Sequence, residues 1–253
     1  MLIACWSPKG GCGTTVVSAA LALVVAASEG PTLLADLAGD VPAVLGVPDP
    51  AGPGLRHWLR AGPDVGADAL ARLEVEAAPG LQLLTAGLRG PNATVGLRGP
   101  NATAGLRGPN ATAGDDDEGD DDGCSGDDPL DPARGLALAA ALAGDQRPVV
   151  ADCGRADAGA GLAVAAGAGL SLLVLRPCYL ALRRALAAPI RPSGVVLVTE
   201  DGRSLTRRDV EEVMGVPVRA EVAYDPAVAR AVDAGLLATR VPRTLERSLR
   251  NAA

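Results

Sequence analysis

Aromatic residues, lysine and histidine are scarce in this sequence. Phenylalanine is absent, aromatic residues make up 2% of the 253 positions, Lys9 is the only lysine among 23 Lys and Arg residues, and His57 is the only histidine. His57 stands beside Trp58 in an amphipathic stretch, where a surface or packing role is favoured over catalysis. No Ser/His/Asp or Cys/His set can be assembled around it, so the sequence gives no support to a catalytic site built on a histidine base.

Disulfide and metal-binding cysteine patterns are also missing. The five cysteines are odd in number, and no two of them have CxxC or metal-ligand spacing. Cys5 and Cys178 are interpreted as small buried hydrophobic residues, which is typical of a reducing compartment. No secretory leader precedes residue 7, and the apolar run 16–27 is too short to span a bilayer. We therefore expect a cytoplasmic protein.

The net charge of −7 comes from one segment. Residues 115–131 contain ten acidic residues and no basic residue. The remainder of the chain is close to neutral and gives no specific signal for nucleic-acid binding.

The segment before this acidic run, 87–113, repeats Gly-Leu-Arg-Gly-Pro-Asn-Ala-Thr three times. One leucine per repeat is too little to bury, so we predict a disordered insert at 88–129 within a single domain that spans 1–253. A neutral expansion of a loop is favoured over a partner-binding or electrostatic role. The sequons at Asn92, Asn101 and Asn110 are interpreted as coincidental.

Outside the insert, apolar runs alternate with helical stretches. Strands are predicted at 2–6, 32–35, 81–84, 148–151, 170–175, 194–199 and 216–222. Helices are predicted at 14–27, 132–143, 159–166, 179–187, 206–214 and 226–234. Strands that are continuous apolar runs, separated by helices, indicate a mostly parallel sheet covered on both faces. The predicted fold class is a doubly wound α/β sandwich of three layers.

The first predicted strand leads into a glycine-rich loop at 7–15 and then into a helix. Backbone N–H groups of such a loop, together with the helix N-terminus, can cradle phosphate groups. A glycine-rich turn that holds no ligand is the alternative interpretation. The loop predicts a nucleotide site formed by Lys9, Gly10, Gly11, Cys12, Gly13, Thr14 and Thr15.

Two positions depart from the standard P-loop, G-x-x-x-x-G-K-[ST]. Pro8 stands at the first glycine position and Thr14 at the lysine position, whereas Thr15 keeps the hydroxyl that ligates magnesium. Lys-Gly-Gly-x-Gly at 9–13 nevertheless resembles the variant loop KGGxGK[ST] of the ParA/MinD group of P-loop ATPases. The resemblance implies ATP and Mg²⁺ as cofactors, and a homodimer in which Lys9 reaches across to the partner's phosphates.

An acidic segment after the second predicted strand extends the resemblance. Residues 33–40 resemble the family's second strand and its Asp-x-Asp switch. Asp36 matches the first aspartate, Ala38 replaces the second, and Asp40 is a candidate substitute. The resemblance makes Lys9, Asp36 and Asp40 the candidate catalytic residues. A structural aspartate that caps a turn is the alternative for each acid.

Later strands resemble the same family. Val-Val-Ala-Asp at 149–152 resembles a Walker B strand, which implies that Thr15 and Asp152 ligate magnesium; a turn-capping role is again the alternative for Asp152. Residues 195–199 resemble the strand before the adenine-reading loop, with Thr199 or Glu200 in place of the family's asparagine. The resemblance covers essentially the whole chain outside the insert. Within the group it is strongest to the divergent pilus-assembly (CpaE/TadZ-like) and septum-site (Ssd-like) branch.

The chain ends in a basic amphipathic stretch at 241–249. MinD-like proteins often end in a membrane-targeting helix of this kind. At this length, docking on the protein's own core is favoured over membrane contact.

The resemblance supports one function and leaves alternatives open. The leading hypothesis is a nucleotide-dependent positioning switch that engages a protein partner in cell division, chromosome partition or pilus assembly. Without the lysine at position 14, triphosphate binding is expected to weaken about tenfold to a hundredfold, the equivalent of one charge-assisted hydrogen bond, and hydrolysis is expected to be weak or lost. The second hypothesis is a pseudo-ATPase scaffold. The third is a metabolic amidoligase or metal-insertion enzyme, for which no substrate-binding residues are found.

Overall fold

The computed structural model describes residues 1–48, 51–62, 64–87, 132–250 and 252. The described residues belong to one compact unit. The predicted insert at 88–129, nearly all of the repeats, the acidic run and the three sequons lie outside the described residues.

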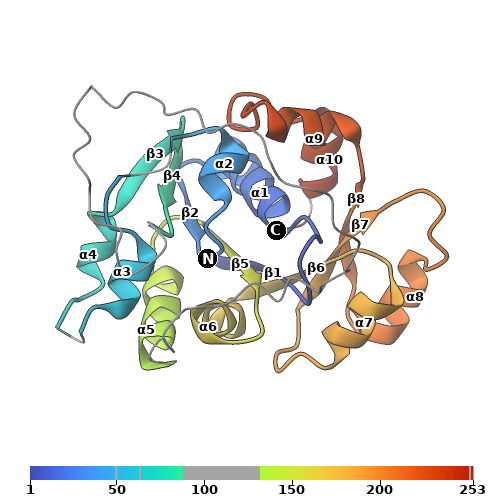
Figure 1. Cartoon of the computed structure of the whole chain (residues 1–253), viewed down its shortest axis with the longest axis horizontal. Helices are drawn as coiled ribbons and strands as arrows, with labels where there is room; N and C mark the ends of the chain where they lie inside the picture. Colours follow the sequence, from blue (N-terminus) through green and yellow to red (C-terminus); the bar gives the residue numbers. More distant parts are fainter. Residues whose placement is uncertain (49–50, 63, 88–131, 251, 253) are drawn as a thin grey trace, which may run out of the picture. The chain divides into compact units, whose positions relative to one another are not determined.

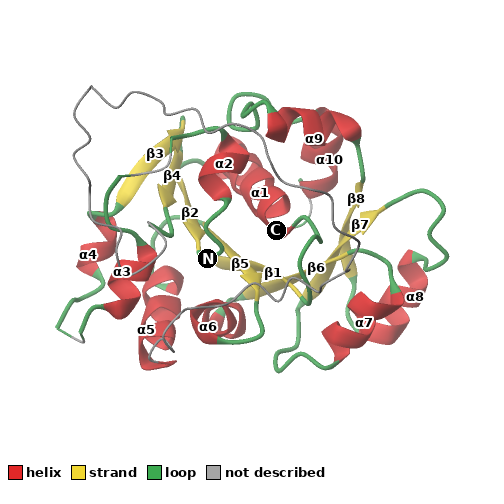
Figure 2. Ribbon diagram, viewed as in Figure 1, coloured by secondary structure: helices red, strands yellow, loops and turns green. Residues whose placement is uncertain are grey.

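A single sheet of eight strands forms the centre of this unit (Figure 2). The strands are ordered β3-β4-β2-β5-β1-β6-β7-β8, and all neighbours are parallel except β3 and β4. Their bounds are β1 Leu2–Ser7, β2 Thr32–Asp36, β3 Glu74–Ala78, β4 Leu81–Leu84, β5 Val149–Arg155, β6 Leu170–Leu175, β7 Gly194–Thr199 and β8 Val218–Ala223. The prediction of a mostly parallel, doubly wound α/β fold is confirmed.

Helices cover both faces of the sheet (Figure 1). One face carries α1 Thr14–Glu29, α2 Val41–Leu45, α9 Pro226–Asp233 and α10 Arg243–Leu249. The other carries α3 Leu55–Arg60, α4 Asp68–Ala71, α5 Pro132–Ala143, α6 Gly159–Gly167, α7 Tyr179–Leu186 and α8 Arg207–Met214. Each layer packs on its own hydrophobic core.

Strand β1 shows why the core has two halves. Leu2, Ala4 and Trp6 belong to the core under α3–α8, whereas Ile3 and Cys5 belong to the core under α1 and α10. Successive side chains of a strand point to opposite faces, so a strand buried on both sides is apolar at nearly every position. This burial accounts for the continuous apolar runs in the sequence.

Four short elements were not predicted: α2, α3, α4 and β3. The helices have five, six and four residues, too few to show a helical period. β3, Glu-Val-Glu-Ala-Ala, is the antiparallel edge strand and is largely exposed, so it lacks the apolar run that marked the others.

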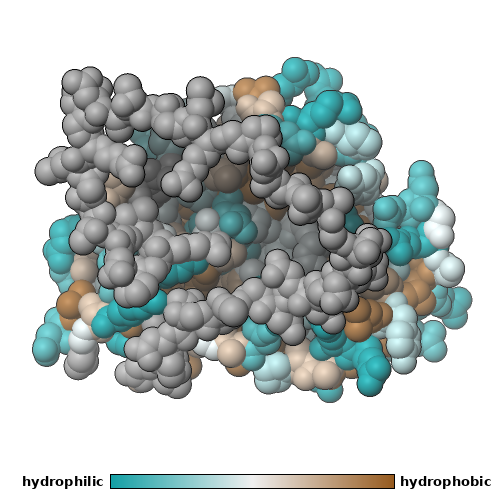
Figure 3. Space-filling model, viewed as in Figure 1, coloured by the Kyte–Doolittle hydropathy of each residue, from teal (hydrophilic) through white to brown (hydrophobic). Residues whose placement is uncertain are grey.

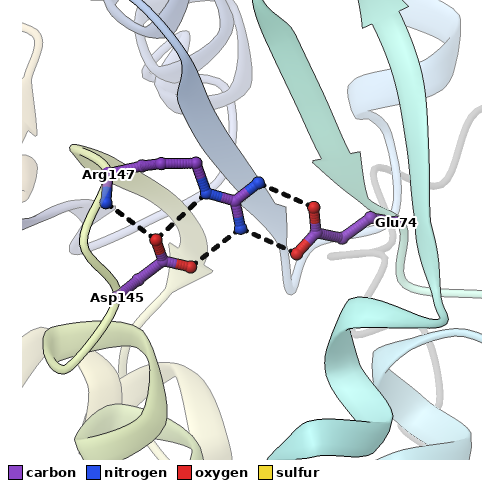
Figure 4. A network of polar contacts seen from close by, with 3 residues as sticks. All are labelled: Glu74, Asp145 and Arg147. Atoms are coloured by element: carbon purple, nitrogen blue, oxygen red, sulfur yellow. Dashed lines mark hydrogen bonds and ion pairs between the residues drawn. The ribbon is translucent and has the colours of Figure 1, made fainter.

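An ion-pair network holds this edge strand to the body of the sheet (Figure 4). The Arg147 guanidinium donates two parallel hydrogen bonds of 2.8 Å to the carboxylate of Glu74 in β3. It also donates to Asp145 at 3.0 and 2.8 Å. The hydrogen bonds from Arg147 lower the pKa of Asp145 and keep it ionised. The network connects β3 to the loop that leads into β5.

Helix α10 packs on the protein's own core. Leu245 and Leu249 are buried beside α1 and β8, while Arg243, Arg247 and Arg250 are exposed. Among the described residues, no helix combines the length and the apolar character needed to cross a bilayer.

Candidate phosphate-binding site

The turn between β1 and α1 forms an open glycine-rich loop. Gly11 and Gly13 have φ angles of 73° and 84°, a left-handed conformation that residues with a side chain rarely adopt. A Cβ atom added at Gly10, Gly11 or Gly13 would meet nothing within 4 Å, so the loop is not filled by other side chains. Cys12 is buried in the core and fixes the loop to the protein.

The N-terminus of α1 opens on this loop. The helix begins at Thr14 after the left-handed Gly13, has no side-chain cap, and has no acidic residue in its first turn. The first N–H groups of a helix lack partners within it and carry a partial positive charge. The loop and helix therefore form a site suited to an anion such as phosphate.

Side chains of the loop differ in their exposure. Thr14 is buried, and its carbonyl accepts a hydrogen bond of 2.8 Å from the Ser18 hydroxyl. Lys9 and Thr15 are half-buried. The Lys9 ammonium donates to the neighbouring carbonyl of Gly10 at 3.5 Å, a long and weak contact.

Two buried aspartates lie near the loop, one on β5, the strand next to β1, and one on β2, the strand beyond β5. Asp36 ends β2, and its pairing partner across the parallel ladder is Asp152 of β5. Both side chains are fully buried. Asp36 accepts hydrogen bonds from the backbone N–H groups of Gly39 at 2.5 Å and Val41 at 3.3 Å. Asp152 accepts one from Gly154 at 3.2 Å through Oδ1.

Burial raises the pKa of both aspartates. It brings the pKa of Asp36 to about 6, against the opposing hydrogen bonds from Gly39 and Val41 and the nearby charge of Arg56. It brings the pKa of Asp152 to about 7, and the charge of Asp36 contributes to that rise. The Thr15 hydroxyl acts in the other direction on the pKa of Asp152, which places Thr15 beside this carboxylate. Two adjacent buried acids favour the presence of a cation.

The residues present fit a magnesium ion. Asp152 Oδ2 is buried and has no hydrogen-bond partner among the described residues, and the Thr15 hydroxyl lies beside the same carboxylate. The described part of the chain contains no group of three or more His, Cys, Asp or Glu side chains that could hold a metal. Mg²⁺ commonly binds one or two protein ligands and takes the rest from phosphates and water. This site suits that mode of magnesium binding. It does not offer enough side chains to surround the ion with protein ligands alone.

Segment 36–40 lies against the backbone that follows Asp152. A Cβ atom on Gly154 would approach the Ala38 Cβ atom to 3.1 Å. Asp40, at the start of α2, lies near enough to raise the pKa of both Asp36 and Asp152. The structure therefore brings the predicted residues Thr15, Asp36, Asp40 and Asp152 together. Where the family's Asp-x-Asp switch has its second aspartate, this chain has Ala38, whose side chain is a methyl group.

Solved structures of other proteins share this arrangement of strands and helices. A ParA family ATPase from Chlorobium tepidum is 16% identical at a TM-score of 0.67, over 98% of this chain and 96% of that one. The septum site-determining protein MinD with Mg-ADP from Pyrococcus horikoshii is 17% identical at 0.65, over 99% and 93%. MinD in the MinC:MinD cell division complex of Aquifex aeolicus is 13% identical at 0.67, over 99% and 93%.

The chain has the ParA/MinD-type ATPase fold. No protein-family model and no curated protein sequence matches the chain. At these identities the likeness concerns the fold alone. The resemblance to this group is thus confirmed for the fold, whereas the closer resemblance to the pilus-assembly and septum-site branch stays a prediction.

On the other side of β1, further residues of this ParA/MinD-type fold follow the carboxyl ends of the strands. The Tyr224 N–H after β8 donates to the carbonyl of Thr199 at 2.7 Å. The Arg176 guanidinium, after β6, lies 5.5 Å from the centre of the Tyr224 ring. Glu200 forms an ion pair with Arg203 at 2.6 Å. Thr199 ends β7 and Glu200 follows it directly, and their role beside an adenine ring stays a prediction.

The surface near α7 and α8 is mixed in polarity. On the face drawn in Figure 3, hydrophobic patches interrupt a hydrophilic surface around these two helices. The exposed large hydrophobic residues there are Tyr179, Leu180, Leu186 and Val213. Scattered apolar residues of this kind are common on protein surfaces, and no site is assigned to them.

Sequence motifs did not reveal Arg56 of α3. Its Nη2 atom donates to the carbonyl of Ala38 at 3.2 Å, and its charge lowers the pKa of Asp36. No motif marks this position, because the side chain reaches segment 36–40 from a separate six-residue helix. Only the fold brings it to the site.

Proposed function

We propose that this protein binds ATP with Mg²⁺ at loop 7–15 and works as a nucleotide-dependent positioning switch. The observation that carries the proposal is the meeting of three features: the open N-terminus of α1, the Thr15 hydroxyl, and the buried Asp152 carboxylate with its orphaned Oδ2 atom. A helix N-terminus attracts phosphate, and a hydroxyl with a carboxylate attracts magnesium. The MinD neighbour from Pyrococcus, which has the same fold, was solved with Mg-ADP.

In this proposal the backbone amides of Gly10, Gly11 and Gly13 hold the phosphates, with Cys12 anchoring the loop. Thr15 and Asp152 hold the magnesium ion, which would neutralise phosphate charge. Asp36 orients segment 36–40 through the amides of Gly39 and Val41.

Hydrolysis would be weak in this site. Thr14 is buried and offers no cation to the phosphates, and Ala38 has no group that could orient an attacking water. Asp40 remains the candidate for that role, because its charge reaches both Asp36 and Asp152.

The same proposal includes a homodimer, in which Lys9 of one subunit contacts the phosphates bound to the other subunit. Within the described part of the chain, the Lys9 ammonium has only the long contact with Gly10 to release, so it is available for a partner's phosphates. One neighbour, MinD of Aquifex, was solved in complex with MinC, a second protein. We infer that the ATP-bound dimer of this chain likewise engages a protein partner in division, partition or pilus assembly. The cytoplasmic placement fits the free thiols of Cys5, Cys12, Cys153 and Cys178.

A pseudo-ATPase scaffold is the second candidate, and the substitutions at Thr14 and Ala38 favour it. Nucleotide binding separates the two functions. Titration of the full chain with a fluorescent ATP analogue and Mg²⁺ should saturate, and Asp152→Asn should remove the magnesium dependence. The absence of saturable binding would support the scaffold.

Restoring the lysine gives a sharper comparison. Thr14→Lys should tighten nucleotide binding about tenfold to a hundredfold, because a charge-assisted hydrogen bond contributes about 1.5–3 kcal/mol. Thr14→Met, with a side chain of similar length and no charge, is the matched control and should not tighten binding. If Thr14→Lys binds no better than Thr14→Met, the loop does not hold phosphates in this way.

A further inference from the structure

Arg56 bridges two segments that are distant in the sequence. Its Nη2 atom donates to the Ala38 carbonyl at 3.2 Å, and its Nη1 atom donates to the Gly87 carbonyl at 3.2 Å. Ala38 lies within segment 36–40 of the proposed nucleotide site, and Gly87 is the last described residue before 88–131. One planar guanidinium therefore holds both carbonyls at a fixed separation.

The helix that carries Arg56 is itself fixed to Gly87. The N–H groups of Leu55 and Arg56 donate to the carbonyls of Thr85 and Ala86 at 2.8 and 3.1 Å. A Cβ atom on Gly54 would come within 2.4 Å of the Gly87 nitrogen, so the two backbones are in close contact. The base of Arg56 consequently cannot shift without moving residues 85–87.

The guanidinium of Arg56 affects Asp36 and Asp152 through its hydrogen bond to Ala38. The next residue, Gly39, donates its N–H to Asp36 at 2.5 Å, and Ala38 lies against Gly154, whose N–H donates to Asp152. A displacement of the Ala38 carbonyl would therefore change the contacts of both carboxylates.

We propose that Arg56 is a positioning residue that fixes segment 36–40 against Gly87, and so couples the proposed nucleotide site to Gly87, the last described residue before 88–131. The inference rests on the proposed function for its biological meaning. Coupling between two sites is reciprocal, so nucleotide and magnesium at Asp152 would restrain Gly87, and a restraint on Gly87 would favour their binding.

The exchange of the Gly39 amide hydrogen in the full chain, without nucleotide, tests the positioning role. Arg56→Gln should accelerate this exchange about tenfold, the equivalent of one lost hydrogen bond. Arg56→Lys keeps the charge but lacks the rigid planar fork whose two terminal nitrogens bind the two carbonyls, so it should restore the slow exchange only in part. Arg72→Gln, which removes an exposed ion pair with Asp68, is the control and should leave the Gly39 exchange unchanged. Exchange in Arg56→Gln equal to that of the unaltered protein would overturn the proposal, as would complete rescue by Arg56→Lys.

A glycine pair tests the coupling to Gly87. Gly87 and Gly80 have φ angles of 79° and 78°, but a Cβ atom at Gly87 would come within 2.7 Å of the Gly54 nitrogen, and one at Gly80 would meet nothing within 4 Å. Gly87→Ala should therefore accelerate the Gly39 exchange, and Gly80→Ala should not. In the Arg56→Gln background, Gly87→Ala should add no further acceleration, because both act through one contact. Additive effects would contradict the coupling.

The exchange experiments and the nucleotide-binding experiments test different claims. If the unaltered protein binds no Mg-ATP, the proposed function fails, while the exchange rates still decide the role of Arg56. If binding is present, Arg56→Gln should weaken it at least threefold and Arg72→Gln should not. Equal binding by these two variants would overturn the coupling to the nucleotide site.

Discussion

Asp36 and Asp152 are partners in the parallel pairing of β2 with β5, and both carboxyl groups are fully buried. Two adjacent carboxylates shielded from water repel each other, and each disfavours the charged form of the other. A proton or a cation relieves that repulsion. The pair thus makes the stability of the ligand-free protein depend on pH in a direction that can be worked out.

The first prediction is that the ligand-free protein loses stability between pH 5 and pH 8. Burial raises the pKa of Asp36 to about 6 and of Asp152 to about 7, above the usual 3.8. The folded state therefore holds protons that the unfolded state has released, and this stabilisation disappears as the pH rises through 6 to 7. For Asp152 the loss from pH 5 to pH 8 should be about 3 kcal/mol, because the pH rises by about two units before it reaches the folded pKa of about 7, at about 1.36 kcal/mol per unit.

Asp152→Asn is the variant that isolates this effect from the other acidic residues of the chain. It removes one titrating group and keeps its shape, so the free energy of unfolding from urea titrations should fall less with pH than in the unaltered protein. At pH 8 without magnesium, Asp152→Asn should be the more stable of the two proteins. A less stable Asp152→Asn at pH 8 would show that the carboxylate is held by contacts that stabilise its charge.

The second prediction concerns the network around Arg147, whose side chain is 27% exposed and pairs with Glu74 and Asp145 at 15% and 20%. Arg147→Lys should lower the free energy of unfolding by about 1–3 kcal/mol, because an ammonium cannot replace the parallel hydrogen bonds of the guanidinium. Arg72→Lys alters an ion pair whose side chains are 71% and 75% exposed, and should change stability by less than about 0.5 kcal/mol. Urea denaturation compares the two, and equal effects would mean that the network does not hold the β3 edge.

The fold was predictable because its central strands are buried on both faces. Strands such as β1 and β6 are buried at every position and apolar at all but one, and the helices between them follow regular patterns. β3 escaped prediction because an exposed edge strand does not need that pattern.

The candidate site was only partly predictable. Loop 7–15 and Asp36 lie at the ends of β1 and β2, and Asp152 lies within β5, directly after the apolar run 149–151, so the sequence shows all of them directly. Arg56 and the orphaned Oδ2 atom of Asp152 follow from three-dimensional contacts and have no sequence pattern.

The third prediction concerns the contact between Gly46 and Gly235. A Cβ atom on Gly46, just after α2, would lie 1.9 Å from the Gly235 carbonyl oxygen, so Gly46→Ala must push α2 away from the chain after α9. Gly215 ends α8 in the same left-handed conformation, with φ 68° against 73°, and a Cβ atom there would meet nothing within 4 Å. Gly215→Ala should cost about 1 kcal/mol and Gly46→Ala at least about 3 kcal/mol. Thermal unfolding of the two variants measures the difference, and similar melting temperatures would contradict the close contact.

The fourth prediction is that Lys9→Ala leaves the fold intact but abolishes nucleotide-dependent dimerisation. The one contact that the ammonium makes with described residues is the 3.5 Å contact with the Gly10 carbonyl, so its removal should change stability by less than about 0.5 kcal/mol. A second subunit's phosphates would lose their only lysine, because the chain has no other. Light scattering should then show a dimer with Mg-ATP for the unaltered protein and a monomer for Lys9→Ala. Lys9→Arg, which keeps a cation at this position, should retain at least part of the dimer. If Lys9→Ala dimerises with Mg-ATP as the unaltered chain does, Lys9 does not act in trans.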